Sequence, residues 1–207
     1  MLTLVYVHDP MCSWCWGFSA CLEDLLGALP QDVRVRRLLG GLAPDSDAPM
    51  PESTRRYVKS QWRRIQQEIP GTRFNFDFWR LCAPRRSTYP ACRAVIAARQ
   101  QGQPFDLSMT RAIQRAYYLQ AKNPSDYSTL LALAGEMGVD VKAFESAYRS
   151  PAVETALAAE IEEARALGVR GFPSLVLTGR GIAANIQVDY LDHRPMLAQI
   201  QNLAATG

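Results

Sequence analysis

Segments with strand character occur only near the two ends of the chain, and this restricts the folds available to it. Residues 2–7 are apolar and rich in β-branched and aromatic side chains, and residues 33–39 alternate apolar and basic side chains. The same character returns only at 174–177 and at 186–190, on either side of a Gly-Arg-Gly turn. Runs of this length and composition predict short strands. A single sheet would therefore have to bring together segments that are far apart in the sequence.

Helical periodicity fills the stretch between the two strand-bearing ends. Prolines and glycines divide this stretch and predict where its helices stop. We expect helices at residues 12–29, 53–69, 88–101, 104–121, 125–137, 140–149, 151–167 and 194–204. The order is thus β-α-β, a helical block, then β-β-α, with the first two strands parallel. This predicts an α/β domain formed by residues 1–51 and 167–207, with an inserted α-helical domain at 52–166.

Two cysteines follow the first predicted strand, in the stretch Asp9-Pro10-Met11-Cys12-Ser13-Trp14-Cys15. Residues three apart lie on the same face of a helix. At a helix N-terminus, free backbone N–H groups and the macrodipole favour a thiolate over a thiol. We therefore predict that Cys12 is a nucleophile and that Cys15, one turn further in, is a buried resolving thiol.

Two other interpretations of the cysteine pair are a pair of core residues and a zinc site. A core pair has no reason to lie at a strand-to-helix junction. For zinc, His8, Cys12, Cys15 and Cys21 supply four nominal ligands. At about 100° per residue, however, Cys21 falls on roughly the opposite side of the helix from Cys12, whereas tetrahedral zinc needs convergent ligands. A redox pair is favoured, and no metal ligands are assigned.

The remaining cysteines and the charge balance restrict the cellular setting. Cys21, Cys82 and Cys92 are expected to be structural, although Cys92 could face the active site; the odd total of five argues against a disulfide framework. The net charge of +3 is too small an excess to indicate nucleic-acid binding. No run resembles a membrane span or a secretory leader. We expect a cytoplasmic protein without nucleic-acid or membrane partners and with no metal.

A second signal lies far along the chain, in the stretch Gly171-Phe172-Pro173-Ser174 just before a predicted strand. Proline can open a strand because it lacks an N–H, and the bond preceding it can be cis. Opposite a redox pair, such a loop can hold an extended peptide near the sulfur. We therefore expect Trp14, Phe172, Pro173 and Ser174 to contribute to substrate binding, with Trp14 and Phe172 as an apolar platform.

The combination of these motifs resembles the DsbA-like branch of thioredoxin-fold proteins, and within it the cytoplasmic FrnE-type thiol–disulfide oxidoreductases. The resemblance is carried by "DPMCSWCWGF" after the first strand, by "GFPS" before the third, and by the stretch Arg86 to Ala94, which resembles a helix start that faces the active site. It implies a thioredoxin fold with a central mixed sheet. It also implies that Cys12 is the nucleophile, Cys15 the resolving thiol and Pro173 the cis proline.

The resemblance implies reduction, isomerisation or oxidation of protein or small-molecule disulfides, with no bound cofactor and glutathione as a possible redox co-substrate. The Ser13-Trp14 dipeptide replaces the Pro-His of the oxidising type member, so a reducing or isomerising direction is expected. One alternative is a glutathione-dependent enzyme resembling 2-hydroxychromene-2-carboxylate isomerases or kappa-class transferases, which typically carry Ser where this chain has Cys12. Another is a non-catalytic binding module.

Overall fold

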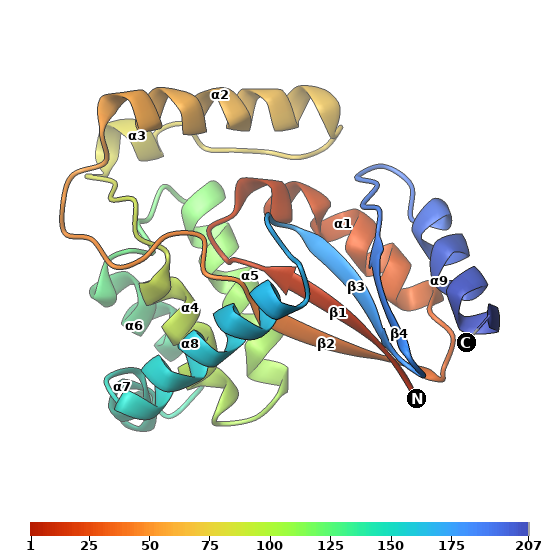
Figure 1. The fold of residues 1–207 in the computed structure, drawn as a ribbon. Coiled ribbons are helices and arrows are strands. Elements are labelled where there is room, and N and C mark those ends of the chain that lie inside the picture. The colour runs from red at the N-terminus through yellow and green to blue at the C-terminus, as the bar shows by residue number, and fades with distance from the viewer. Residues whose placement is uncertain (207) are drawn as a thin grey trace.

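The computed structural model describes residues 1–206, and a four-stranded mixed sheet lies at its centre (Figure 1). The strands are β1 (Leu2–His8), β2 (Val33–Leu39), β3 (Ser174–Gly179) and β4 (Ile182–Ile186), in the spatial order β2-β1-β3-β4. β1 pairs in parallel with β2 and antiparallel with β3, which pairs antiparallel with β4. The prediction of a mixed α/β fold, with a sheet built from both ends of the chain, is confirmed.

Helices cover both faces of the sheet, which explains why its inner strand β1 is mostly apolar. One face packs against α1 (Ser13–Ala28) and α9 (Arg194–Thr206), with Leu4 of β1 in that cluster. The other face carries Val5 and Val7 and packs against α8 (Pro151–Ala166) through Ala164. Because side chains alternate along a strand, β1 supplies both clusters.

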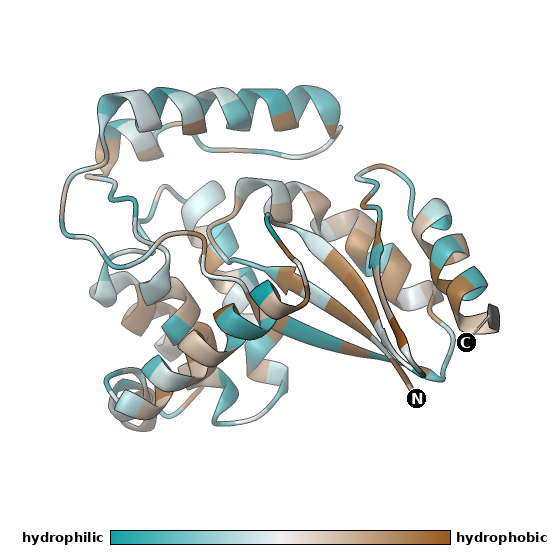
Figure 2. Ribbon diagram, viewed as in Figure 1, coloured by the Kyte–Doolittle hydropathy of each residue, from teal (hydrophilic) through white to brown (hydrophobic). Residues whose placement is uncertain are grey.

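The helical block lies beside the sheet and has its own core (Figure 1). Its elements are α2 (Glu52–Glu68), α3 (Phe78–Leu81), α4 (Tyr89–Arg99), α5 (Pro104–Tyr118), α6 (Tyr127–Glu136) and α7 (Val141–Tyr148). Trp62 of α2 is fully buried against six aromatic rings, including Phe74 and Tyr118. Figure 2 shows that α2 is otherwise mostly hydrophilic, in contrast to the more hydrophobic strands β1 and β3. α2 is therefore held mainly through this aromatic cluster.

The structure corrects the predicted last strand and adds one helix. The strand predicted at 186–190 is wrong, because β4 spans Ile182–Ile186. Arg180 and Gly181 both have positive φ angles, 51° and 78°, which is the backbone of a two-residue hairpin turn. The strand therefore begins directly after the turn. The short helix α3 was not predicted. The division at 52–166 stays a prediction, and its last helix, α8, packs on the sheet.

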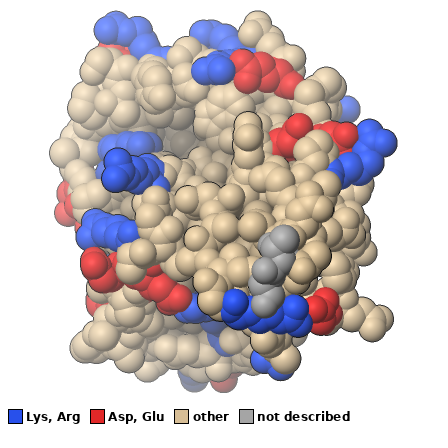
Figure 3. Space-filling model, turned by 45° about the vertical axis from the view of Figure 1, so that its right-hand side comes forward, with Lys and Arg blue, Asp and Glu red and all other residues tan. Residues whose placement is uncertain are grey.

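Charged side chains do not form one continuous field on the face shown in Figure 3. Basic and acidic groups are interspersed around its edge, and its centre is largely uncharged. Within residues 1–206, no helix is long and apolar enough to cross a membrane.

Candidate active site

Cys12 occupies the N-cap position of α1. Its backbone is extended (φ −78°, ψ 115°), and its Sγ accepts a hydrogen bond from the backbone N–H of Cys15 at 3.4 Å. Its N–H donates to the Asp9 carbonyl at 3.0 Å. A side chain at the N-cap satisfies one of the otherwise unpaired N–H groups of the first turn. The nucleophile predicted from the sequence thus lies at the helix terminus, where a negative charge on sulfur would be stabilised.

Cys15 lies one turn further along α1 and is completely buried. Burial raises the pKa of the Cys15 thiol well above its ordinary value, and the neighbouring Cys12 raises it further. Tyr6 projects from β1 toward this region, and burial followed by the two cysteines raises the pKa of its hydroxyl well above 10. Tyr6 therefore stays protonated beside the pair, as a hydroxyl that can donate to sulfur.

Asp9 is a fully buried carboxylate that holds the loop leading into α1. Its Oδ1 accepts from the N–H of Met11 at 2.8 Å, and its Oδ2 accepts from the N–H of Leu42 at 2.7 Å and the hydroxyl of Thr88 at 2.6 Å. Burial raises the pKa of Asp9, and these hydrogen bonds oppose the rise. Asp9 acts on Cys15 in two opposed ways, because a hydrogen bond with its backbone lowers the pKa of Cys15 and the charge of its carboxylate raises that pKa by less. The main role of Asp9 is therefore to fix the loop.

The loop before β3 lies against the redox pair, although it is 160 residues away in sequence. The thiol of Cys12 donates to the carbonyl oxygen of Phe172 at 3.4 Å, and the Phe172–Pro173 peptide bond is cis. The Ser174 hydroxyl donates to the carbonyl of Gly171 at 2.8 Å, which closes a turn within the loop. The structure thus brings this loop next to Cys12.

A groove of about 200 Å³ opens beside Cys12. Trp14 and Phe172 line it, as does the segment 85–88 before α4, whereas Pro173 and Ser174 are not among its described lining residues. Trp14 is half-buried and donates from Nε1 to Gln61 of α2 at 3.2 Å. The further lining residues are Met11, Cys12, Ser13, Leu42, Met50, Thr54, Tyr57, Val58, Gln61 and Tyr117. Most of the groove is apolar or aromatic, with Arg85 and Arg86 at one side.

The sequence did not single out Tyr6 or the contribution of α2. Side chains alternate between the two faces of a strand, so Tyr6 points to the same face of β1 as Leu2 and Leu4, which is the face covered by α1. No local sequence pattern marks Tyr57 and Gln61 as groove residues, because they reach the site only through packing of the helical block. Cys92 lies behind the pair, with its thiol 3.5 Å from Asp9 Oδ2. In residues 1–206 no group of three or more His, Cys, Asp or Glu side chains is arranged to hold a metal ion.

Comparison with known proteins gives a family for this arrangement. A model of the DSBA-like thioredoxin domain matches residues 3–194, which is nearly the whole chain. The chain belongs to the DSBA-like thioredoxin domain family.

Two solved structures align over essentially the complete DSBA-like chain. A "putative protein disulfide isomerase" from Nitrosomonas europaea is 25% identical with a TM-score of 0.83, and the alignment covers 99% of this chain and 98% of that one. The cytosolic disulfide reductase DsbM from Pseudomonas aeruginosa is 26% identical with a TM-score of 0.76, over 99% and 100% of the two chains. DsbM has also been solved with GSH.

Curated relatives of this DSBA-like chain are longer proteins. The ClpXP adapter protein SpxH of Shouchella clausii is 25% identical over 176 residues, and SpxH of Bacillus subtilis is 24% identical over 171 residues. Each alignment covers 81% of this chain and 55% of the relative. The chain thus spans about half the length of the curated relatives that it matches.

Proposed function

We propose that the protein is a cytoplasmic thiol–disulfide oxidoreductase that reduces disulfides with the Cys12–Cys15 pair. The observation that carries this proposal is the asymmetry of the pair. Cys12 is 5% exposed and caps α1 in the wall of the groove, whereas Cys15 is fully buried one turn further along α1 and has a raised pKa. A nucleophile that meets substrate and a resolving thiol that does not are what thiol–disulfide exchange requires.

The proposed reaction has two exchange steps. The Cys12 thiolate attacks one sulfur of a substrate disulfide; a Cys12–substrate bond forms, the substrate S–S bond breaks, and the departing thiolate takes up a proton. Cys15 then loses its proton and attacks Cys12 Sγ, which forms the Cys12–Cys15 disulfide and releases the second substrate sulfur as a thiolate. Two electrons pass from the pair to the substrate. The Phe172 carbonyl, at 3.4 Å from Cys12 Sγ, marks where the substrate backbone would lie.

The direction and the reductant are proposed from chemistry and from the relatives. The raised pKa of Cys15 disfavours a resting dithiolate, and the sequence between the cysteines has no histidine that would stabilise one. The neighbour DsbM is described as a cytosolic disulfide reductase and has been solved with GSH. We therefore assign the reducing direction, with two molecules of glutathione as the reductant that restores the dithiol and leaves as glutathione disulfide.

The groove supports a peptide substrate with an apolar side chain next to its disulfide. Trp14 and Phe172 are far apart in the sequence but line the same groove, with Tyr57 62% exposed at its α2 wall. Arg85 is paired with Asp126 at 2.6 Å, whereas Arg86 has no ion-pair partner among the described residues. An acidic residue near the substrate disulfide would therefore be favoured.

The test is reduction of insulin disulfides by the purified protein in a glutathione buffer. We expect Cys12→Ser to lose at least a hundredfold in rate. Cys15→Ala should attack but not release, so that mixed disulfides at Cys12 accumulate and can be identified by mass spectrometry. Cys82→Ser is the matched control and should keep the wild-type rate, because Cys82 is not among the lining residues of the groove and its thiol donates to the carbonyl of Ala121.

Two results would contradict the proposal. One is a Cys12→Ser protein that retains full activity in a glutathione conjugation assay, which would favour the transferase alternative. The other is a purified protein that holds one zinc per chain and releases it only when Cys12 and Cys15 are modified.

A further inference from the structure

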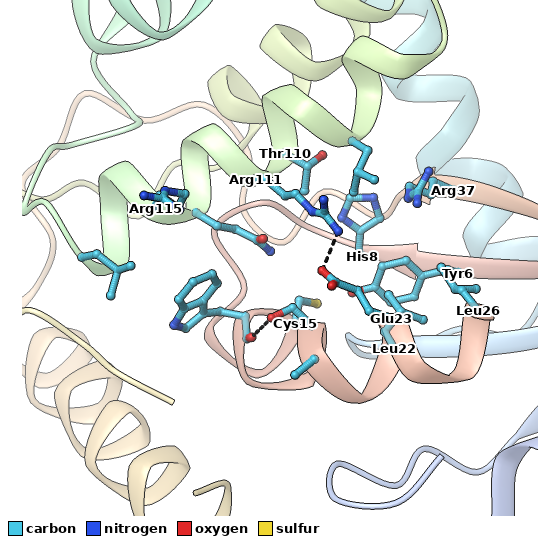
Figure 4. Close-up of a pocket in the computed structure, with 16 residues that line it drawn as sticks. Tyr6, His8, Cys15, Leu22, Glu23, Leu26, Arg37, Thr110, Arg111 and Arg115 are labelled. Atoms are coloured by element: carbon cyan, nitrogen blue, oxygen red, sulfur yellow. Dashed lines mark hydrogen bonds and ion pairs between the residues drawn. The ribbon is translucent and has the colours of Figure 1, made fainter. Parts of the chain in front are cut away.

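A second cavity, of about 590 Å³, shares no lining residue with the groove, and Figure 4 shows the side chains that surround it. Cys15 contributes to its wall, whereas Cys12 lines the groove instead. Its walls come from β1, β2, α1 and α5, so that it lies between the sheet domain and the helical block. Its volume is in the range of small-molecule sites. The proposed disulfide exchange uses only the Cys15 thiol of this cavity.

The cavity is lined by three arginines and one carboxylate. Arg37 comes from β2, and Arg111 and Arg115 from α5. Glu23 of α1, the one acidic residue among the described lining residues, forms an ion pair with Arg111 at 2.5 Å. Within residues 1–206, Arg37 and Arg115 have no ion-pair partner. Two guanidinium groups are therefore left to attract an anion, and guanidinium binds carboxylate or phosphate well.

His8 is a buried polar group without a partner at the inner end of the cavity. It is 1% exposed, and neither of its ring nitrogens has a hydrogen-bond partner among the described atoms. Its ring stacks on Tyr6 with the centroids 4.8 Å apart, which fixes its orientation (Figure 4). Burial, with Arg37 and Arg99 nearby, lowers the pKa of His8 to about 3. The neutral ring offers one donor and one acceptor, which a bound molecule would satisfy.

The rest of the wall is apolar and can bury a carbon skeleton. It consists of the rings of Tyr6 and Trp16 and of four leucines, namely Leu22, Leu26, Leu107 and Leu119. Thr110 and Gln114 of α5 add hydrogen-bonding groups, and Gln114 is 5% exposed. An inorganic ion alone would leave this apolar surface uncovered. The lining is thus suited to an organic molecule that carries an acidic group.

We propose that this cavity is a binding site for a small organic anion, a carboxylate or a phosphate ester with an apolar body. Arg37 and Arg115 bind the acidic group or groups, the leucine side chains cover the body, and His8 hydrogen-bonds to a polar atom of the ligand. The site is separate from the groove that receives the disulfide. A ligand here would contact the wall formed by Cys15, from the side that the substrate does not reach.

The test measures binding of phenylacetate and of phenyl phosphate to the reduced full-length chain by calorimetry and by ¹H–¹⁵N spectra. Neither probe contains a thiol or disulfide, so the result does not depend on the redox activity proposed above. We expect at least one of them to bind at 1:1 stoichiometry, with shifts at Thr110 and Gln114. Which probe binds more tightly distinguishes a carboxylate ligand from a phosphate ester. The neutral benzyl alcohol and inorganic phosphate should bind at least tenfold more weakly.

Substitution of the cavity arginines tests whether the probes bind in this cavity. Arg37 and Arg115 lie at opposite ends of the cavity (Figure 4), and a probe with one acidic group binds at one of them, so Arg37→Gln or Arg115→Gln should weaken binding at least fivefold. Both residues are accessible enough for the fold to be retained. Arg34→Gln is the matched control, because it removes the same charge from the same strand. Residues 34 and 37 point to opposite faces of the sheet, so Arg34 faces away from the cavity. No binding of either organic anion at millimolar concentration would overturn the proposal. So would equal weakening by Arg34→Gln, or no effect of either cavity variant.

Discussion

At the scale of single residues, Cys12 and Cys15 have different reactivity because of what surrounds each sulfur. Cys12 Sγ has an N–H donor from the helix and an open groove beside it. Cys15 is fully buried in the wall of the separate cavity, and burial together with the neighbouring Cys12 opposes its ionisation. In the proposed exchange, the same residue type three positions apart would therefore serve as nucleophile at one position and as resolving thiol at the other.

His8 gives a pH-dependence that stability measurements can detect. Its pKa is about 3 in the folded chain and about 6.5 in an unfolded one. Between these values the unfolded chain binds a proton that the folded chain does not, so stability falls as pH falls through this window. From pH 7 to pH 5 the loss is about 2 kcal/mol, at roughly 1.4 kcal/mol per unit.

Urea unfolding of wild type and His8→Phe at pH 7 and pH 5 measures this contribution. The variant should lose about 2 kcal/mol less than wild type on acidification. Phenylalanine keeps a ring against Tyr6, and comparison of the two proteins cancels the opposite trend from the raised pKa of Asp9. An identical pH-dependence in both proteins would show that His8 is protonated in the folded state.

At the scale of elements, the end of β2 is shaped to receive the loop before β3. Gly40 continues β2 by donating to the carbonyl of His8 at 2.8 Å, and a Cβ at residue 40 would lie 2.0 Å from Cε1 of Phe172. No real contact is that short. Glycine at this position therefore leaves room for the ring that forms one wall of the groove.

Gly40→Ala should displace Phe172 and reduce both stability and the rate of disulfide reduction. Overpacking of this kind costs about 1–3 kcal/mol, and we expect a severalfold loss of rate, because the Phe172 carbonyl lies at the Cys12 thiol. Gly27→Ala is the matched control, since a Cβ at that position in α1 meets nothing within 4 Å. It should be neutral or stabilise by up to about 1 kcal/mol. Equal behaviour of the two variants in insulin reduction would contradict this account of the loop.

The elements also show what local sequence can and cannot predict. The apolar run 2–7 and the cysteine at a strand-to-helix junction are local patterns, and both predicted their elements correctly. The segment 186–190 has an alternating pattern as well, but Val188 and Tyr190 pack from a loop onto the α1 side of the sheet. The cavity behind Cys15 was not predictable, because Arg37 and Arg115 lie on separate elements with no spacing rule between them.

At the scale of the whole molecule, one buried carboxylate connects the helical block to the sheet. Glu160 of α8 forms an ion pair with Arg99 of α4, and its Oε2 accepts from the N–H of Leu39 at the end of β2 at 2.7 Å. Arg99 is also paired with Asp106 of α5 at 2.7 Å. Three helices and a strand thus meet at these side chains.

Glu160→Gln should destabilise the whole chain rather than one part of it. The amide oxygen can still accept from Leu39, but a largely buried arginine loses one of its two charged partners, at a cost of about 2–3 kcal/mol. Glu162→Gln on the same helix is the control, because its pair with Arg165 is exposed and contributes below about 1 kcal/mol.

Thermal unfolding followed by circular dichroism and by tryptophan fluorescence measures both variants. We expect the two probes to shift together in Glu160→Gln, because the ion pair joins the helical block, which contains Trp62 and Trp79, to the sheet, whose helix α1 carries Trp14 and Trp16. Separate transitions, with only one shifted, would show that the two parts unfold independently.

β1 acquires its two neighbouring strands at very different times during synthesis. β2 follows β1 closely in the chain, but the other edge of β1 waits for β3 at residues 174–179. Until then the Phe172 carbonyl is not available to Cys12, and an unpaired β1 edge is open to other strands. While the helices between β2 and β3 are being synthesised, the growing chain therefore carries its thiols without this loop, which places a risk of misoxidation and aggregation in that interval.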